Sequence, residues 1–210
     1  MTADALYRTA GAGLAAGGIA AALGEAAEDF VTADAHSWLV IGGSAATGIG
    51  SILVAMCLAA VIGRQSPRTG PLGLAGYALL AVGVLVIGVY ANFNNAFVGP
   101  NLPDALVANW PLPLTLLIGV ASLAEIAGLA LLGVAIVRAR VFPAALGWTL
   151  VGAAVLAAAS FLPFADMHYA AAVAVVAMYG ALAALGAALL RRPGFSRATA
   201  GGPLVAGAGE

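Results

Sequence analysis

One acidic residue, Glu125, lies near the middle of a long apolar segment, where ionisable side chains are rare. In an α-helix it would lie about 18 Å from the start of that segment, close to the midplane of a lipid bilayer. An acid at that depth costs about 2.5–3.5 kcal/mol to insert, so by default it is a candidate functional group facing a helix-bundle interior. Ser122 and Gly128, one turn before and after it, form a narrow face suited to burial. Glu125 and Ser122 are therefore the candidate functional residues.

A carboxyl group in this position could relay a proton, balance a cationic substrate or act as a general acid. The structural alternative is a protonated glutamic acid that donates a hydrogen bond to a neighbouring helix. The other apolar segments carry no arginine or histidine at a matching depth, so no ion pair with Glu125 is predicted. The sequence leaves the functional and the structural interpretation open.

A second group of polar residues surrounds the predicted external ends of the helices. A spacing of three and four residues places Glu25, Glu28 and Asp29 on one helix face. With residues of two later segments they could form a metal site of histidines and carboxylates. They could equally form a solvated acidic rim, with Asp166 as a helix N-cap. The spacing does not force convergence, so no metal or other cofactor is predicted; the full rim comprises Glu25, Glu28, Asp29, Asp34, His36, Asp166 and His168.

Several chemistries are excluded by absent residue types. The chain has no lysine, which excludes a lysine Schiff base, and its single cysteine, Cys57, cannot form an internal disulfide. A haem held across the membrane needs histidines inside the apolar segments, and both histidines lie outside them. Nucleotide-binding and rhomboid-protease motifs are also missing. We therefore expect no nucleic-acid partner, and favour a protein that is not an enzyme while leaving one enzymatic alternative open.

The composition is that of an integral membrane protein. Of 210 residues, 63% are hydrophobic and 8% are charged, whereas soluble domains are about 25% charged. We predict an all-α fold, a polytopic membrane bundle in one domain over residues 1–197, followed by a disordered cytoplasmic tail, 198–210. Each membrane-spanning segment needs about 20 residues, and six candidates occupy roughly residues 6–24, 38–63, 71–91, 112–137, 143–162 and 169–190. The first is rich in alanine and glycine, and could instead be the apolar part of a signal peptide.

The arginines predict the orientation of the six segments. All eight fall on one side of a six-span arrangement, and the positive-inside rule makes that side cytoplasmic. Both termini are then cytoplasmic, in the cell inner (plasma) membrane. The arginines are Arg8, Arg64, Arg68, Arg138, Arg140, Arg191, Arg192 and Arg197.

Small residues four apart are expected to bring helices together, because lipid provides no hydrophobic drive for their association. Such stripes occur at Gly13, Gly17 and Ala21, and again at Gly42, Ala46 and Gly50, with a shorter one at Gly180 and Ala184. They could pack within one subunit or form the face of a homo-oligomer or of a complex with another membrane protein. The longest predicted loop, residues 92–111, is external and could cover a site or only cap the bundle.

The segment from Arg138 to Trp148 combines an arginine, Pro143 and the pair Gly147-Trp148. It resembles a turn that joins the fourth and fifth helices in a group of bacterial six-helix membrane proteins with no agreed activity. The resemblance covers about a dozen residues and implies the six-helix arrangement alone.

Three functions remain for such a protein. The first is a small transporter or channel-like protein, which could be coupled to protons, with Glu125 as its central ionisable group. The second is a non-catalytic accessory or assembly subunit that packs against another membrane protein. The third is a membrane-embedded enzyme that uses Glu125 as an acid. Beyond the lipid bilayer, the sequence identifies no substrate or partner.

Overall fold

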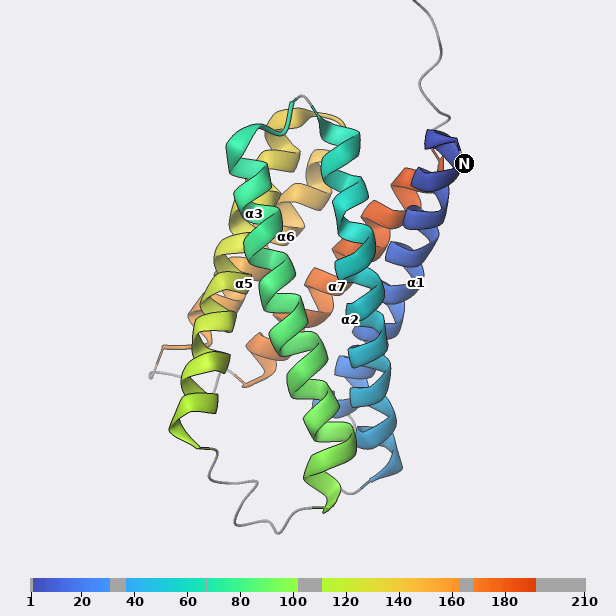
Figure 1. Ribbon diagram of the computed structural model, residues 1–210. Coiled ribbons are helices and arrows are strands. Elements are labelled where there is room, and N and C mark those ends of the chain that lie inside the picture. The colour runs from blue at the N-terminus through green and yellow to red at the C-terminus, as the bar shows by residue number, and fades with distance from the viewer. Residues whose placement is uncertain (1, 31–36, 67, 102–110, 163–167, 192–210) are drawn as a thin grey trace, which may run out of the picture.

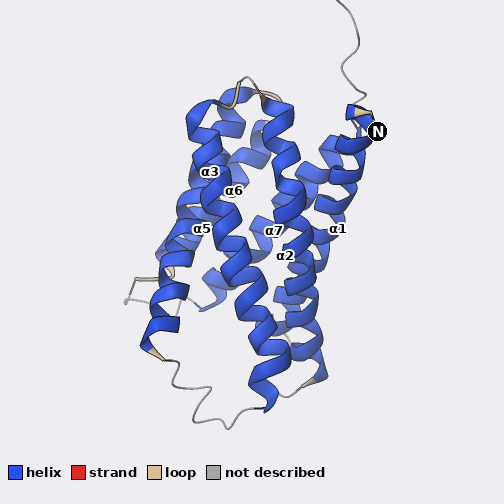
Figure 2. Cartoon of the chain, in the orientation of Figure 1, coloured by secondary structure: helices blue, strands red, loops and turns tan. Residues whose placement is uncertain are grey.

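The computed structural model describes residues 2–30, 37–66, 68–101, 111–162 and 168–191, and in these ranges the chain is entirely helical apart from caps and turns (Figures 1 and 2). Six helices follow one another along the chain, which confirms the predicted all-α class. Five of them are α1 Ala3–Phe30, α2 Trp38–Gln65, α5 Leu112–Ala139, α6 Ala144–Ala159 and α7 His168–Arg191. The remaining one, which we call the third helix, consists of α3 Gly70–Gly83, η1 Val84–Ala91, η2 Asn94–Val98 and η3 Gly99–Asn101.

Five of the six helices are long and apolar enough to cross a membrane, and α6 is a shorter apolar helix of 16 residues. Two helices run further than the sequence predicted. The first continues to Phe30, and the third continues to Asn101 through the first ten residues of the predicted loop. The third helix can continue because its last turns widen into π-helix, which accommodates Asn92 without breaking the helix. Residues 102–110 and the tail 198–210 lie outside the described ranges.

Local signals explain where the helices begin and end. The Ser37 side chain accepts a hydrogen bond from Val40 N (3.2 Å) and caps α2. Pro71 and Pro143 stand at or just before helix starts, where a missing N–H costs no hydrogen bond. Arg140 ends α5 in the left-handed conformation (φ 53°), which turns the chain sharply toward α6.

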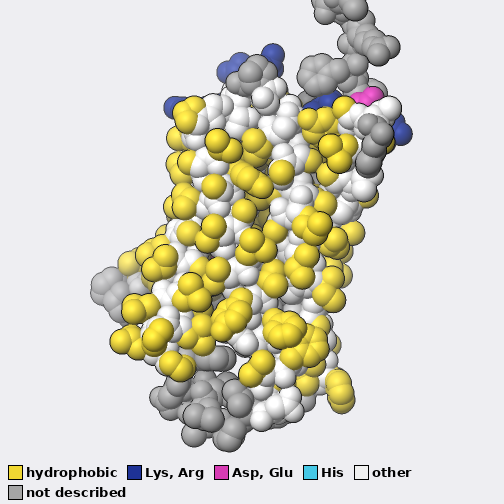
Figure 3. All heavy atoms as spheres, in the orientation of Figure 1, with side chains coloured by type: hydrophobic (Ala, Val, Ile, Leu, Met, Phe, Trp, Pro, Cys, Tyr) yellow, Lys and Arg dark blue, Asp and Glu magenta, His cyan; other side chains and the backbone are white. Residues whose placement is uncertain are grey.

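The helices form a ring in the order α1, α2, third helix, α5, α6 and α7, with α7 returning to α1 (Figure 1). The described arginines lie at one end of this ring, at the top of Figure 3, and we call it the arginine end. At this end Arg64 lies over the Tyr7 ring, 5.7 Å from its centroid. Exposed apolar side chains of all six helices lie on the surface between the two ends, and Figure 3 shows them on one face.

The interior differs between the two halves of the bundle. Toward the arginine end it is filled by fully buried aliphatic side chains, among them Leu58, Leu132, Leu182 and Leu185. The fully buried serines and threonine of α2 lie in the middle and opposite half. Packed leucines thus fill much of the arginine end, which also holds Gln65, a fully buried residue whose side-chain amide has no hydrogen-bond partner among the described residues.

Glycines allow the helices to approach closely within the chain. A Cβ atom added at Gly17 would meet the backbone of α2 at Gly50, and one at Gly50 would meet α1 at Gly17 and Ala21. The stripe of the first helix is thus used inside one subunit. Gly42 and Gly180 have no atom within 4 Å of the position of an added Cβ.

Replacing Gly128 by valine should destabilise the bundle, because the new Cβ would collide with the Leu80 backbone of α3. Overpacking of this kind costs about 1–3 kcal/mol, so the thermal unfolding midpoint in detergent should fall by several degrees. Gly119→Val on the same α5 is the matched control, since no atom lies within 4 Å of its added Cβ. Equal midpoints for the two variants would contradict this packing.

Candidate functional site

Glu125 lies at the centre of α5 with its backbone against Gly83 of the third helix, where a Cβ atom would collide with it. Its partly buried side chain borders a cavity of about 30 Å³ between α5, α6 and α7. The remaining lining is apolar and includes Leu129, Ala157 and Met178. A water molecule needs about 10–15 Å³ of such space, so the cavity has room for water beside a carboxyl group.

Tyr179 of α7 and Ser51 of α2 meet in the middle of the bundle, with a distance of 2.6 Å between their hydroxyl oxygens. Their exposed fractions are 1% and 0%. Glu125 lies close enough to Tyr179 for an electrostatic interaction. Gly88 of the third helix packs directly on both hydroxyl groups, so no larger residue fits there without moving them.

Asn92 connects the third helix with α1. Its Nδ2 donates long hydrogen bonds to Glu25 Oε1 (3.5 Å) and to Ile87 O (3.4 Å), the carbonyl that faces it across one π-helical turn. The asparagine is 6% exposed, so these contacts lie inside the protein. Glu25 interacts electrostatically with Glu125 as well as with Glu28, one turn further along α1.

Three hydroxyl residues of α2, Ser44, Thr47 and Ser51, are fully buried on one helix face, at a spacing of three and four. Thr47 Oγ1 donates to Ala21 O of α1 at 3.3 Å. The Ser44 hydroxyl lies near the Glu28 carboxylate and interacts with it, yet Ser44 Oγ and Glu28 Oε1 form no well-aligned hydrogen bond with any group.

Together these side chains form an interior polar column that runs from the centre of the bundle to the end opposite the arginines. Ser51 of α2 and Tyr179 of α7 are hydrogen-bonded at its centre, with Glu125 of α5 near Tyr179. Asn92 of the third helix contacts Glu25 of α1, and α1 also carries Glu28. The polar column consists of Glu125, Tyr179, Ser51, Asn92, Glu25, Thr47, Ser44 and Glu28.

Some of the residues predicted for the site belong to the polar column and others do not. Ser122 donates to Ile118 O of its own helix (3.0 Å) and is not part of the polar column. Glu25, predicted at an external rim, is directed into the bundle at Asn92. Asp29 is partly buried one turn beyond Glu25.

The predicted metal ligands lie partly inside and partly outside the described ranges. Asp34, His36 and Asp166 lie outside them, and of His168 only the backbone, at the start of α7, is described. Within the ranges that are described, no three histidine, cysteine, aspartate or glutamate side chains are placed to hold a metal ion.

Most residues of the polar column were not predicted from the sequence. The positions 44, 47 and 51 do carry a helical signal, because three hydroxyl residues recur on one face of an otherwise apolar segment. Tyr179 also gave a signal, since it lies in the middle of its segment and not at an end, where interfacial tyrosines are expected. Asn92 gave none, because it was assigned to a loop.

The polar column has carboxyl groups but, among the described residues, no arginine: those of the described helices lie at or near the arginine end. Ionised carboxylates in an apolar interior are costly unless a positive charge balances them. The chain therefore offers a site where a proton or another cation would be the balancing charge. No family model, curated protein or solved structure matches this chain, so the site alone supports a function.

Proposed function

We propose that the protein is an integral membrane protein that spans the bilayer six times, with the arginine end in the cytoplasm and the opposite end outside the plasma membrane. Five helices of sufficient length and the apolar outer surface support insertion. The 16 residues of α6 measure about 24 Å, and exposed Phe161 and Leu162 extend its apolar length. Buried positions along α1 pack against α2 and α7, which favours a retained helix over a signal peptide.

The orientation can be tested with single cysteines in a Cys57→Ser background. Ala3→Cys places an exposed thiol at the arginine end, and Leu112→Cys places one at the opposite end. A membrane-impermeant maleimide added to intact cells should label Leu112→Cys at once, and Ala3→Cys only after the membrane is opened. The reverse order of labelling would contradict the proposed orientation, and labelling of both in intact cells would contradict insertion.

For the activity, we propose a small transporter that moves or exchanges protons or another cation, with Glu125 as its central ionisable group. The observation that carries this proposal is the pair of buried contacts Ser51–Tyr179 and Asn92–Glu25. Glu125 lies near Tyr179, and the described residues of this interior supply no balancing arginine. Hydroxyl and amide groups on three helices continue the polar path toward the external end.

The packed leucines at the arginine end favour a transporter over an open channel, because among the described residues of that half Gln65 is the one fully buried polar side chain. The small cavity argues against the enzyme hypothesis. Its volume of about 30 Å³ is far below the 300 Å³ or so at which small-molecule sites begin. An accessory subunit would not need a carboxyl group at the centre of α5.

The test is proton uptake by vesicles that contain the purified protein and a pH-sensitive dye. A potassium diffusion potential, negative inside, should acidify these vesicles faster than protein-free vesicles. A rate equal to that of protein-free vesicles would contradict proton movement. The same measurement with sodium or potassium tracers separates a proton from another cation.

A further inference from the structure

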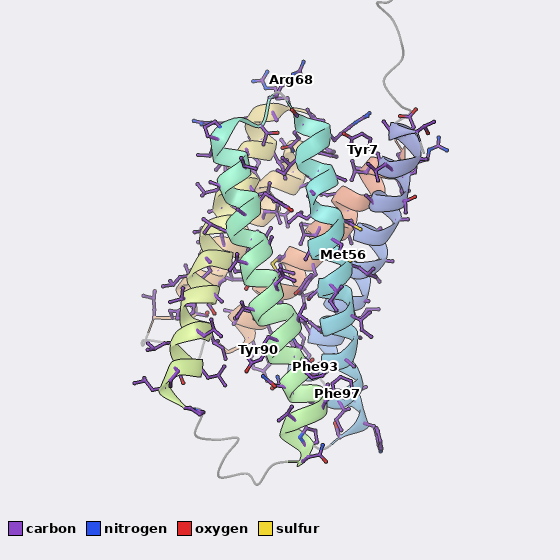
Figure 4. All side chains as sticks on the ribbon, viewed as in Figure 1. Tyr7, Met56, Arg68, Tyr90, Phe93 and Phe97 are labelled. Atoms are coloured by element: carbon purple, nitrogen blue, oxygen red, sulfur yellow. The ribbon has the colours of Figure 1, made fainter. Side chains whose placement is uncertain are left out.

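A groove on the outer surface of the bundle lies between α2 and the third helix, toward the end opposite the arginines. It has a volume of about 280 Å³ and almost entirely apolar walls. Ile49 and Ile52 line it from α2, while Phe93 and Phe97 project from the third helix with their ring centroids 4.8 Å apart (Figure 4). All four side chains are exposed, so the groove opens to the surroundings of the bundle, where the proposed membrane places lipid.

One polar residue also lines this groove. Ser44 is fully buried, and its Oγ has no hydrogen-bond partner. The hydroxyl lies near the Glu28 carboxylate, whose Oε1 is likewise buried without a partner. Buried oxygens without a well-aligned hydrogen bond destabilise a folded protein. The groove thus joins apolar walls to one buried hydroxyl group, that of Ser44, and the Glu28 carboxyl group lies next to this hydroxyl without lining the groove.

We propose that this groove binds an amphipathic amine from the lipid phase, with its apolar part on the isoleucine and phenylalanine side chains and its ammonium group at Ser44 and Glu28. An ammonium group supplies three donors and a positive charge, whereas a lipid acyl chain supplies neither. The two phenylalanine rings offer a further attraction for a cation. The volume suits a molecule of one or two rings, just below the usual range of about 300–1,000 Å³.

The site is distinct from Glu125 but shares Ser44 with the polar column, and Ser44 lies near Glu28. That the amine is also a transported substrate rests on the proposed function, in which a cation leaving the polar column exchanges with a proton. Binding to the groove does not depend on that step, so the two can fail separately.

The probe is 1-naphthylmethylammonium, with the uncharged 1-naphthylmethanol as its isosteric control. Binding to the purified full chain in lipid nanodiscs is followed by naphthalene fluorescence, with subtraction of empty nanodiscs of the same composition. The ammonium compound should bind saturably and about tenfold or more tightly than the alcohol, as expected for a charge-assisted hydrogen bond.

Two sets of variants locate the site. Glu28→Gln and Ser44→Ala should remove the preference for the ammonium compound, and Ile49→Trp should block both probes by filling the groove. Met56→Trp is the matched control, because Met56 is a 74% exposed α2 residue that does not line the groove (Figure 4). Unchanged binding by Ile49→Trp would overturn the proposal, since this variant leaves the polar groups intact.

Equal binding of the amine and the alcohol would also overturn it, by showing a slot for lipid chains alone. Absence of saturable amine binding, with potential-driven proton uptake intact, would reject the groove as an amine site and leave the proposed transport activity standing. Loss of proton uptake with amine binding intact would do the opposite.

Discussion

Replacement of Glu125 by glutamine is expected to lower potential-driven proton uptake by protein-containing vesicles to the rate of protein-free vesicles. Glutamine has nearly the same shape but cannot gain and lose a proton. It therefore removes the one ionisable group at the centre of α5 and leaves its packing against Gly83 in place. Because the Glu125 side chain forms no hydrogen bond with another described residue, the substitution should leave no partner unsatisfied.

Asp4→Asn provides the matched control for this result. It makes the same chemical change on an exposed carboxyl group at the arginine end of α1, outside the polar column. Uptake by this variant should equal that of the unchanged protein, and both variants should unfold at the same temperature. If Glu125→Gln retained full uptake, Glu125 would be a structural residue and an accessory role would become the better hypothesis.

The sequence was sufficient to predict the helices, because their signal is one of composition and length. Six apolar segments, proline at helix starts and arginine between alternate segments are all local features. The all-α class and the depth of Glu125 in its own helix follow from them. Even the lengthened third helix was missed for a local reason, since asparagines usually mark loops and here Asn92 is held by Glu25 and Ile87 inside a π-helical turn.

The site could not be predicted in the same way, because it depends on which helix faces lie against one another. The pairing of Ser51 with Tyr179 joins positions 128 residues apart. Glu25 was predicted to belong to a solvated rim, because it directly follows the first predicted segment, residues 6–24. The structure shows α1 continuing to Phe30, which leaves Glu25 more than one turn inside. Which side chains meet depends on the order of the helices in the ring and on the rotation of each helix about its axis, and close contacts at glycines help to fix both.

Replacement of Gly88 by alanine is expected to reduce proton uptake strongly, because the added methyl group would collide with Ser51 Oγ and with the Tyr179 hydroxyl. These two hydroxyl groups are fully buried and only 2.6 Å apart, so one of them must move and their hydrogen bond must lengthen or break. Overpacking also costs about 1–3 kcal/mol of stability. Both vesicle uptake and the thermal unfolding midpoint should therefore fall.

The control is Gly42→Ala on α2, which adds the same methyl group where no atom lies within 4 Å. It should change neither measurement. A second variant, Tyr179→Phe, removes the phenolic hydroxyl without adding volume, and should reduce proton uptake for the same reason as Gly88→Ala.

The combination of Gly88→Ala with Tyr179→Phe separates the role of the hydroxyl pair from a general loosening of the bundle. If both act on this one pair, the double variant loses no more uptake than either alone, because coupled sites are not additive. Its thermal midpoint should also recover toward that of Tyr179→Phe, since removal of the phenolic oxygen makes room for the methyl group beside Ser51. Additive losses of uptake, or a midpoint no higher than that of Gly88→Ala alone, would show that Gly88 acts through helix packing and would remove the Ser51–Tyr179 pair from the proposed path.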